Sequence, residues 1–197
     1  MIFIDARGLQ WAAAPGPLRE GLSFRIPAGL SWITGGEGRG KTALLSLLAG
    51  TLQPSGGRLL RLADSLCQPD VTDAAHDATA ARAWLAAWRA RLPDWQDDVA
   101  HDLADAFGLA EHLDKPLFML STGSRRKVGL VAAAAGRAEL TLLDAPFAAL
   151  DARACRLLTD LLAEAAACPD RAWVVADYQR PAGLAPEALA AWIDLGD

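Results

Sequence analysis

The sequence predicts an α/β fold built on a largely parallel sheet. Three observations predict it: short apolar, strand-like runs alternate with helical stretches, a glycine-rich loop joins one such strand to a helix, and a carboxylate ends a later strand. In folds of this kind the ligand lies beyond the carboxyl ends of the strands. We therefore expect the functional residues in the loops at that edge of the sheet.

The glycine-rich loop fits the pattern G-x-x-x-x-G-K-[ST] at every fixed position. The apolar run Leu30–Thr34 before it predicts a buried strand, and Ala43–Ala49 after it has helical composition, with Gly50 as its stop. Glycines let backbone N–H groups converge on an anion, and the helix N-terminus adds the positive end of its dipole. The pattern therefore predicts a phosphate-binding loop made of Gly35, Gly36, Glu37, Gly38, Arg39, Gly40, Lys41 and Thr42, followed by Ala43.

Composition limits the classes of protein that remain. A chain of 197 residues with 52% hydrophobic and 22% charged residues suits one globular domain. A net charge of −5 argues against a nucleic-acid binder, since the one dense basic cluster, Arg125–Lys127, is short. Three scattered cysteines match no metal pattern and suit a reducing cytosol. No apolar run reaches the length of a membrane span, so any membrane part is expected from another chain.

The middle of the chain has a different character from its two ends. From Asp70 to about Leu120 it is predicted to be helical, with a second helix capped by Asp94 and ended by Gly108. Its tryptophans recur at helical spacing, which favours the core of a helical subdomain over a cofactor site. The ends carry predicted strands at Ile2–Ile4, Leu22–Ile26, Arg58–Leu62, Leu140–Asp144 and Ala172–Ala176, a turn at Pro15–Pro17, a helix from Asp151 to about Ala167 and a tail from Leu184 with a helix and a last short strand.

Further stretches occur in a set order around the loop. Leu120–Ser124 (LSTGS) precedes the strand Leu140–Asp144, and Ala149–Asp151 follows that strand. Together with the loop they make nearly the whole chain resemble the ATP-binding-cassette (ABC) ATPase family. Leu120–Ser124 is similar to the family's LSGGQ signature, Leu140–Asp144 to its Walker B strand and Ala149–Asp151 to its D-loop. Gln68 falls where the Q-loop glutamine is expected, and Trp11 where an aromatic residue stacks on adenine.

The resemblance implies a P-loop NTPase fold with a mainly parallel core sheet and an N-terminal antiparallel β part. It implies a single domain over residues 1–197, with a small helical subdomain inserted at about 70–135. It also implies a head-to-tail dimer with a second ABC ATPase subunit, identical or different, that sandwiches two ATP molecules. A separate transmembrane subunit would hold this cytoplasmic chain on the inner face of a membrane.

The resemblance also assigns roles to single residues. ATP and Mg²⁺ are the implied ligands, and Lys41 is expected to reach the β- and γ-phosphates. The implied metal residues are Thr42, Gln68 and Asp144, with Gln68 also in a catalytic role. The signature residues Ser121, Thr122 and Gly123 would meet the partner's nucleotide. Because the basic cluster at 125–127 opposes the dipole of its own helix, it indicates either a nearby anion or a solvated basic turn.

The chain departs from the family pattern at two catalytic positions. Ala145 stands where a glutamate polarises the attacking water. Asp177, or a neighbour if the register shifts by one residue, stands where a histidine contacts the γ-phosphate. A methyl group holds no proton, and the loss of such a group typically costs about 10²–10⁴-fold in rate. A carboxylate at 177 adds repulsion to a triphosphate unless Mg²⁺ or a proton intervenes. Asp177 as a replacement catalytic residue is the alternative, but the sequence favours an ATP binder with impaired hydrolysis.

Two functions remain open. The first is the ATP-binding subunit of a transporter, paired with a complete partner; the short chain and the stretch Asp144–Asp151 are similar to haem-exporter ATPase subunits. The second is a non-catalytic, nucleotide-sensing regulatory module that dimerises with ATP. A DNA-maintenance protein is disfavoured because 197 residues leave no room for a long coiled coil. A P-loop kinase would leave the signature unexplained.

Overall fold

The computed structural model describes residues 1–12 and 18–196, and the turn predicted at Pro15–Pro17 lies outside them. The chain forms two compact units. The first unit comprises Met1–Leu66, Glu139–Pro146 and the chain from Leu162 onward. The second comprises Cys67–Ala138 and Phe147–Leu161.

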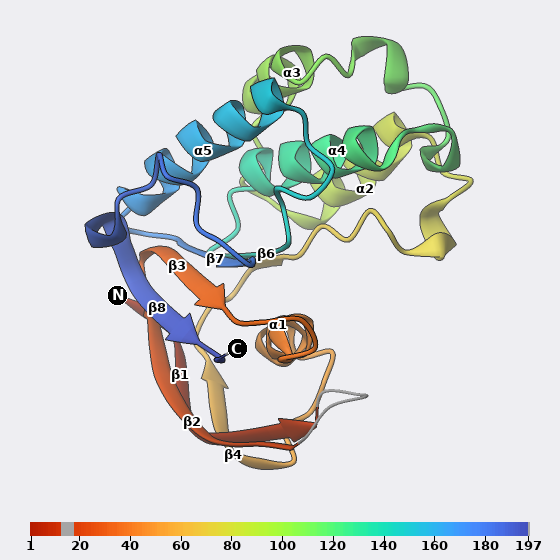
Figure 1. Ribbon diagram of the computed structural model, residues 1–197. Helices are drawn as coiled ribbons and strands as arrows, with labels where there is room; N and C mark the ends of the chain where they lie inside the picture. Colours follow the sequence, from red (N-terminus) through yellow and green to blue (C-terminus); the bar gives the residue numbers. More distant parts are fainter. Residues whose placement is uncertain (13–17, 197) are drawn as a thin grey trace. The chain divides into compact units, whose positions relative to one another are not determined.

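The strands form one antiparallel and one mainly parallel sheet (Figure 1). The antiparallel sheet has the order β2-β1-β4, and the larger sheet the order β5-β6-β7-β3-β8. In the larger sheet β3 pairs in parallel with β7 and β8, and β6 pairs in parallel with β7. These sheets confirm the predicted fold class. The strands are β1 (Ile2–Ala12), β2 (Leu18–Pro27), β3 (Gly29–Thr34), β4 (Gly56–Arg61), β5 (Leu66–Cys67), β6 (Leu140–Asp144), β7 (Ala172–Ala176) and β8 (Leu189–Asp194).

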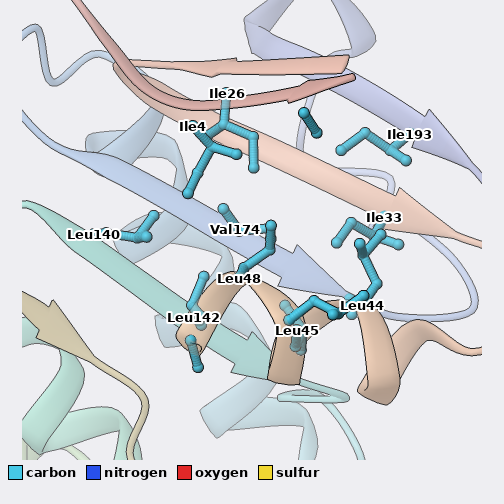
Figure 2. Packing of buried hydrophobic residues seen from close by; sticks show 14 of the residues in the cluster. Ile4, Ile26, Ile33, Leu44, Leu45, Leu48, Leu140, Leu142, Val174 and Ile193 are labelled. Atoms are coloured by element: carbon cyan, nitrogen blue, oxygen red, sulfur yellow. The ribbon is translucent and has the colours of Figure 1, made fainter. Parts of the chain in front are cut away.

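The core of the first unit lies between the strands and α1 (Lys41–Ala49) (Figure 2). Leu44, Leu45 and Leu48 of α1 are buried among side chains of both sheets. β7 is buried along its whole length, as expected for a central parallel strand covered on both faces. Burial of one leucine stabilises a fold by about 1.5–3 kcal/mol, so α1 and the loop that begins it are firmly held.

The second unit is mainly helical, with short 3₁₀ turns. Trp84 and Trp88 of α2 are buried in edge-to-face contact, as the core interpretation of the tryptophans predicted. The predicted cap at Asp94 is wrong: the Trp95 amide donates to the Leu92 carbonyl and extends the turn, so the next helix begins at Asp97. The helices are α2 (Ala81–Arg91), α3 (Asp97–Ala106) and α4 (Thr122–Ala135), with 3₁₀ turns at Ala74–His76, Ala110–His112 and Leu117–Met119.

Two further elements complete the chain. α5 (Ala152–Ala166) leads from the second unit into the first, and a 3₁₀ turn at Pro186–Ala188 precedes β8 where one helix was expected in the tail. Within the described residues, no helix combines the length and the apolarity needed to cross a membrane.

Candidate functional site

The phosphate loop connects β3 to α1, as the sequence predicts (Figure 1). Gly38 and Gly40 have φ angles of 71° and 89°, a conformation that glycine adopts without steric cost. At Gly35 a side chain would come within 2.9 Å of the Leu195 Cβ atom. α1 begins after Gly40, which has no side chain to cap the helix. The first-turn amides are therefore available to an anion.

Lys41 folds back onto its own loop. Its Nζ atom donates hydrogen bonds to the carbonyl oxygens of Gly35 at 2.5 Å and Gly36 at 2.9 Å. The same nitrogen lies 4.0 Å from the centre of the Tyr178 ring, in a cation–π contact. The lysine thus has partners within the protein before any phosphate arrives.

Thr42 and Asp144 meet at the carboxyl ends of β3 and β6. The Thr42 hydroxyl donates to the Asp144 carboxylate at 2.6 Å, across a sequence separation of 102 positions. β7 lies between these two strands in the sheet, so the pair is brought together by the parallel order β6-β7-β3 and by the first turn of α1. Both side chains offer hard oxygen ligands, which are the ligands that Mg²⁺ prefers.

Ala145 follows β6 with a φ angle of 42°, in the left-handed region. Its amide donates to the Ala176 carbonyl oxygen at 2.8 Å, which fixes this turn against the end of β7. This conformation destabilises the folded state by about 1–3 kcal/mol when the residue has a Cβ atom, and such residues cluster at functional sites. The strained backbone remains where the family's glutamate would stand, but its side chain is a methyl group.

Asp177 and Tyr178 follow β7. The Asp177 amide donates to the Ile33 carbonyl oxygen at 3.1 Å, and the Asp177 carboxylate accepts a hydrogen bond from the Tyr178 amide at 2.7 Å. These bonds place the segment beside the phosphate loop. Tyr178 is not among the site residues predicted from the sequence; its only signal is its place directly after Asp177, where a register shift of one residue would bring it to the predicted position.

These groups belong to the first unit, and the loop from Glu37 onward lines one pocket of about 660 Å³ together with the residues after β6 and β7. Gly35 and Gly36 are not among the residues that line it. A volume of this size is typical of small-ligand sites. The structure therefore brings together most of the site predicted in this unit. The lining residues are Glu37, Gly38, Arg39, Gly40, Lys41, Thr42, Ala43, Ser46, Thr51, Leu52, Asp144, Ala145, Asp177 and Tyr178.

The adenine-stacking prediction for Trp11 is wrong. Its indole is 1% exposed and belongs to the core cluster with Leu9 and Ile26. Side chains alternate between the two faces of a strand, and residue 11 falls on the inward face of β1 together with residue 9. A ring buried on both faces cannot stack on a base.

The signature segment lies in the second unit, at the start of α4. Ser121 is the helix N-cap, because its hydroxyl oxygen accepts the Ser124 amide at 3.0 Å. The backbone of Gly123 lies directly against the carbonyl of Ala149, leaving no space there for a side chain. Thr122 is exposed in the first turn. Signature and D-loop are therefore in direct contact within this unit.

The basic cluster of α4 is tied to its own unit. Arg125 donates to the Val71 carbonyl and pairs with Asp77, and Arg126 donates to the Ala148 carbonyl at 2.6 Å. Lys127 pairs with Asp151 at 2.6 Å. The interpretation of this cluster as a solvated basic turn is wrong, because each side chain has a partner that compensates its unfavourable place at a helix N-terminus.

Asp151 is held as a carboxylate. The hydrogen bond from Lys127, supported by the Ala154 amide, lowers the pKa of Asp151 to about 2.

Gln68 follows β5 at the start of the second unit and is half-buried. Its metal and catalytic roles stay predictions.

Comparisons with known proteins agree on one family. The family model described as "ABC transporter" matches residues 20–148. The cytochrome c biogenesis ATP-binding export protein CcmA of Alkalilimnicola ehrlichii is 37% identical over 81% of this chain and 74% of its own length. The protein of the same name from Salmonella typhi is 35% identical over 81% of this chain and 82% of its own. The predicted resemblance to haem-exporter ATPase subunits is thus supported.

Solved structures share the fold. A putative ABC transporter ATP-binding protein from Pyrococcus furiosus aligns with a TM-score of 0.75 at 18% identity, over 98% of this chain and 96% of its own. A putative metal-chelate type ABC transporter in an inward-facing conformation aligns with a TM-score of 0.72 at 22% identity, over 91% and 74%. The chain belongs to the ABC transporter family and is an ATP-binding subunit of that kind.

Proposed function

We propose that this chain binds Mg-ATP as one half of a head-to-tail dimer in an ABC transporter, and that its own site hydrolyses ATP poorly. One observation supports the proposal above all. The pocket unites Lys41, Thr42 and Asp144, the residues proposed to bind phosphate and metal, with a methyl group at the catalytic position, Ala145.

Binding is supported by the chemistry of the pocket. Lys41 and the first turn of α1 offer an ammonium and backbone N–H groups to the phosphates. Thr42 and Asp144 are suited to hold Mg²⁺, which when bound neutralises phosphate charge. Their mutual hydrogen bond uses the proton of the Thr42 hydroxyl and leaves lone pairs on the oxygens of both residues, so it is compatible with metal binding. These groups support the proposal that the pocket binds Mg-ATP.

Impaired hydrolysis is supported by the side chains that face the same pocket. Ala145 cannot accept a proton from water, and the only carboxylates beside it in the pocket lining are Glu37, Asp144 and Asp177. Asp177 already accepts the Tyr178 amide, and its negative charge opposes that of a triphosphate. We expect the nucleotide to be retained and turned over slowly.

The partner chains follow from the family. A second ATPase subunit would meet Ser121, Thr122 and Gly123, so that this chain completes the partner's site while its own site holds ATP. A separate transmembrane subunit would supply the transport path and hold the chain at the inner face of a membrane. The names of the relatives point to export in cytochrome c biogenesis as the process served.

The test measures ATP affinity and phosphate release on the purified chain. Wild type is expected to bind ATP with little turnover, and Ala145→Glu to raise turnover by about 10²–10⁴-fold, because it restores a group that orients water. Glutamate adds no new backbone strain, since alanine already bears the left-handed conformation. Ala145→Gln is the matched control, with similar shape and no carboxylate, and is expected to stay slow.

Two results would contradict the proposal. Wild-type turnover equal to that of Ala145→Glu, abolished by Asp177→Ala, would make Asp177 the catalytic residue. If the wild-type chain does not bind ATP, the proposal that the pocket is a nucleotide site is wrong.

The second candidate is the regulatory module that dimerises with ATP. It is favoured by the replacement of both catalytic residues of the family pattern, the glutamate by Ala145 and the histidine by Asp177. Stoichiometric, ATP-dependent dimers that show no turnover even after addition of the membrane subunit and a complete ATPase partner would favour it over transport.

A further inference from the structure

Tyr178, the one tyrosine in the chain, lies over the lysine of the phosphate loop. It follows β7 and lines the same pocket as the loop and Asp144. The Tyr178 side chain remains 55% exposed, so hydrophobic burial does not explain its position. Its ring centre is 4.0 Å from the Lys41 Nζ atom, a distance typical of a direct cation–π contact.

The ammonium of Lys41 has three protons to donate. Two hydrogen bonds go to the carbonyl oxygens of Gly35 and Gly36, and the Tyr178 ring covers a further side of the nitrogen. A phosphate that approaches Lys41 must therefore replace partners that the protein itself supplies. Of these partners, the ring is the easiest to displace, because the Tyr178 side chain is exposed and lies in the loop that directly follows β7.

We propose that Tyr178 is a specificity-determining residue that competes with the phosphate chain for Lys41. The ring lowers the affinity for ligands whose β- or γ-phosphate needs this lysine, and leaves ligands without those phosphates unaffected. This inference rests on the proposed function, in which Lys41 binds ATP. Beyond that function, the affinity for ATP is tuned by an aromatic side chain of the same protein.

The magnitudes favour competition over a complete block. An ammonium–phosphate hydrogen bond is charge-assisted and stronger than a contact between an ammonium and an aromatic face in a partly exposed site. ATP therefore displaces the ring, and the ring weakens binding by about 3- to 30-fold. Aliphatic replacement removes the effect, and phenylalanine preserves it because the face of the ring is what contacts the charge.

The first arm of the test measures affinities for ATP, ADP and AMP on the full chain with Mg²⁺. Tyr178→Leu is expected to bind ATP and ADP about 3- to 30-fold more tightly than wild type, with AMP unchanged. Tyr178→Phe is the matched control and should stay within about twofold of wild type for all three nucleotides. Equal or weaker ATP binding by Tyr178→Leu would overturn the inference, as would an equal gain in Tyr178→Phe.

The second arm observes the ring directly. Because the chain has a single tyrosine, incorporation of 3-fluorotyrosine gives one ¹⁹F resonance. Mg-ATP is expected to shift this resonance and AMP to leave it in place, whereas Lys41→Met should shift it without any nucleotide. A resonance insensitive to both Mg-ATP and Lys41→Met would overturn the contact. If no variant binds ATP, the proposed function fails; if all bind it equally, only the role of Tyr178 fails.

Discussion

The two helix N-termini that the family uses to hold ATP are built differently in this chain. α1 in the first unit follows Gly40, which has no side chain, and its first turn opens into the pocket. α4 in the second unit is capped by Ser121, and the basic residues of its first turn are tied to neighbouring backbone and carboxylates. The first end is prepared for an anion. The second has its polar groups satisfied within its own unit, and under the proposed function a partner subunit brings the nucleotide to it.

The same contrast holds for the lysines of these two segments. Lys41 contacts loop carbonyls and an exposed ring, which we expect a phosphate to displace at small cost. Lys127 pairs with Asp151, whose other oxygen caps α5 through the Ala154 amide. Under the proposed function Lys41 is therefore a ligand group in the first unit, whereas Lys127 makes a structural ion pair in the second.

The largest expected effect is on nucleotide binding. Lys41→Met should weaken ATP binding by about 10²-fold or more, because charge-assisted hydrogen bonds to phosphate are lost. Lys127→Met is the matched control in the second unit and should leave ATP affinity of the isolated chain unchanged. Isothermal titration of both variants measures the difference; similar losses in the two would remove the distinction between the units.

Next in size is the packing of the signature against the D-loop. Gly123→Ala should destabilise the protein by about 1–3 kcal/mol, because a Cβ atom there overlaps the Ala149 carbonyl and the D-loop must shift. This outweighs the better helix propensity of alanine, at most about 1 kcal/mol. Thr122→Ala, at an exposed neighbouring position, is the control and should stay within about 0.5 kcal/mol. Denaturant unfolding checks both, and an unchanged midpoint for Gly123→Ala contradicts the contact.

The cap of α4 should give a smaller effect. Ser121→Ala is expected to cost about 1 kcal/mol in the free energy of unfolding, since the Ser124 amide loses its acceptor. Ser121→Gly should lower the free energy of unfolding by only a few tenths of a kcal/mol, because glycine is itself a good cap residue. If alanine and glycine prove equal to serine, the hydroxyl does not cap the helix in solution.

The smallest effect concerns the Lys127–Asp151 pair and acid. Since the pKa of Asp151 is lowered to about 2 in the folded protein, its stabilisation is present above the ordinary pKa near 4 and is lost as the pH falls through about 2. Lys127→Met should raise this pKa and move acid unfolding to higher pH. Carboxyl ¹³C titration measures it, with Asp5, whose pKa is lowered by Arg7, as the internal control. If the pKa of Asp151 is unchanged in Lys127→Met, the Ala154 amide alone stabilises the carboxylate.

Patterns of residue type and spacing predicted more of the fold than of the contacts. The strand Leu140–Asp144, the loop and the end of α1 at Gly50 appear where the sequence placed them, because each depends on local composition and glycine conformation. The start of α3 was misplaced because Trp95 extends the preceding turn through a bond to Leu92. Such a bond leaves no pattern in the sequence.

The sequence by itself determined the family, the phosphate loop and the absence of a carboxylate at Ala145, since these are matters of residue identity and order. Only the tertiary structure decided that Trp11 is buried, that the basic cluster of α4 is tied to neighbouring groups, and that Tyr178 covers Lys41. Each of these depends on the direction of a side chain and on a partner far away in the chain. The phosphate loop and the tyrosine are 137 positions apart, counted from Lys41 to Tyr178, and the parallel pairing of β3 with β7 brings them together.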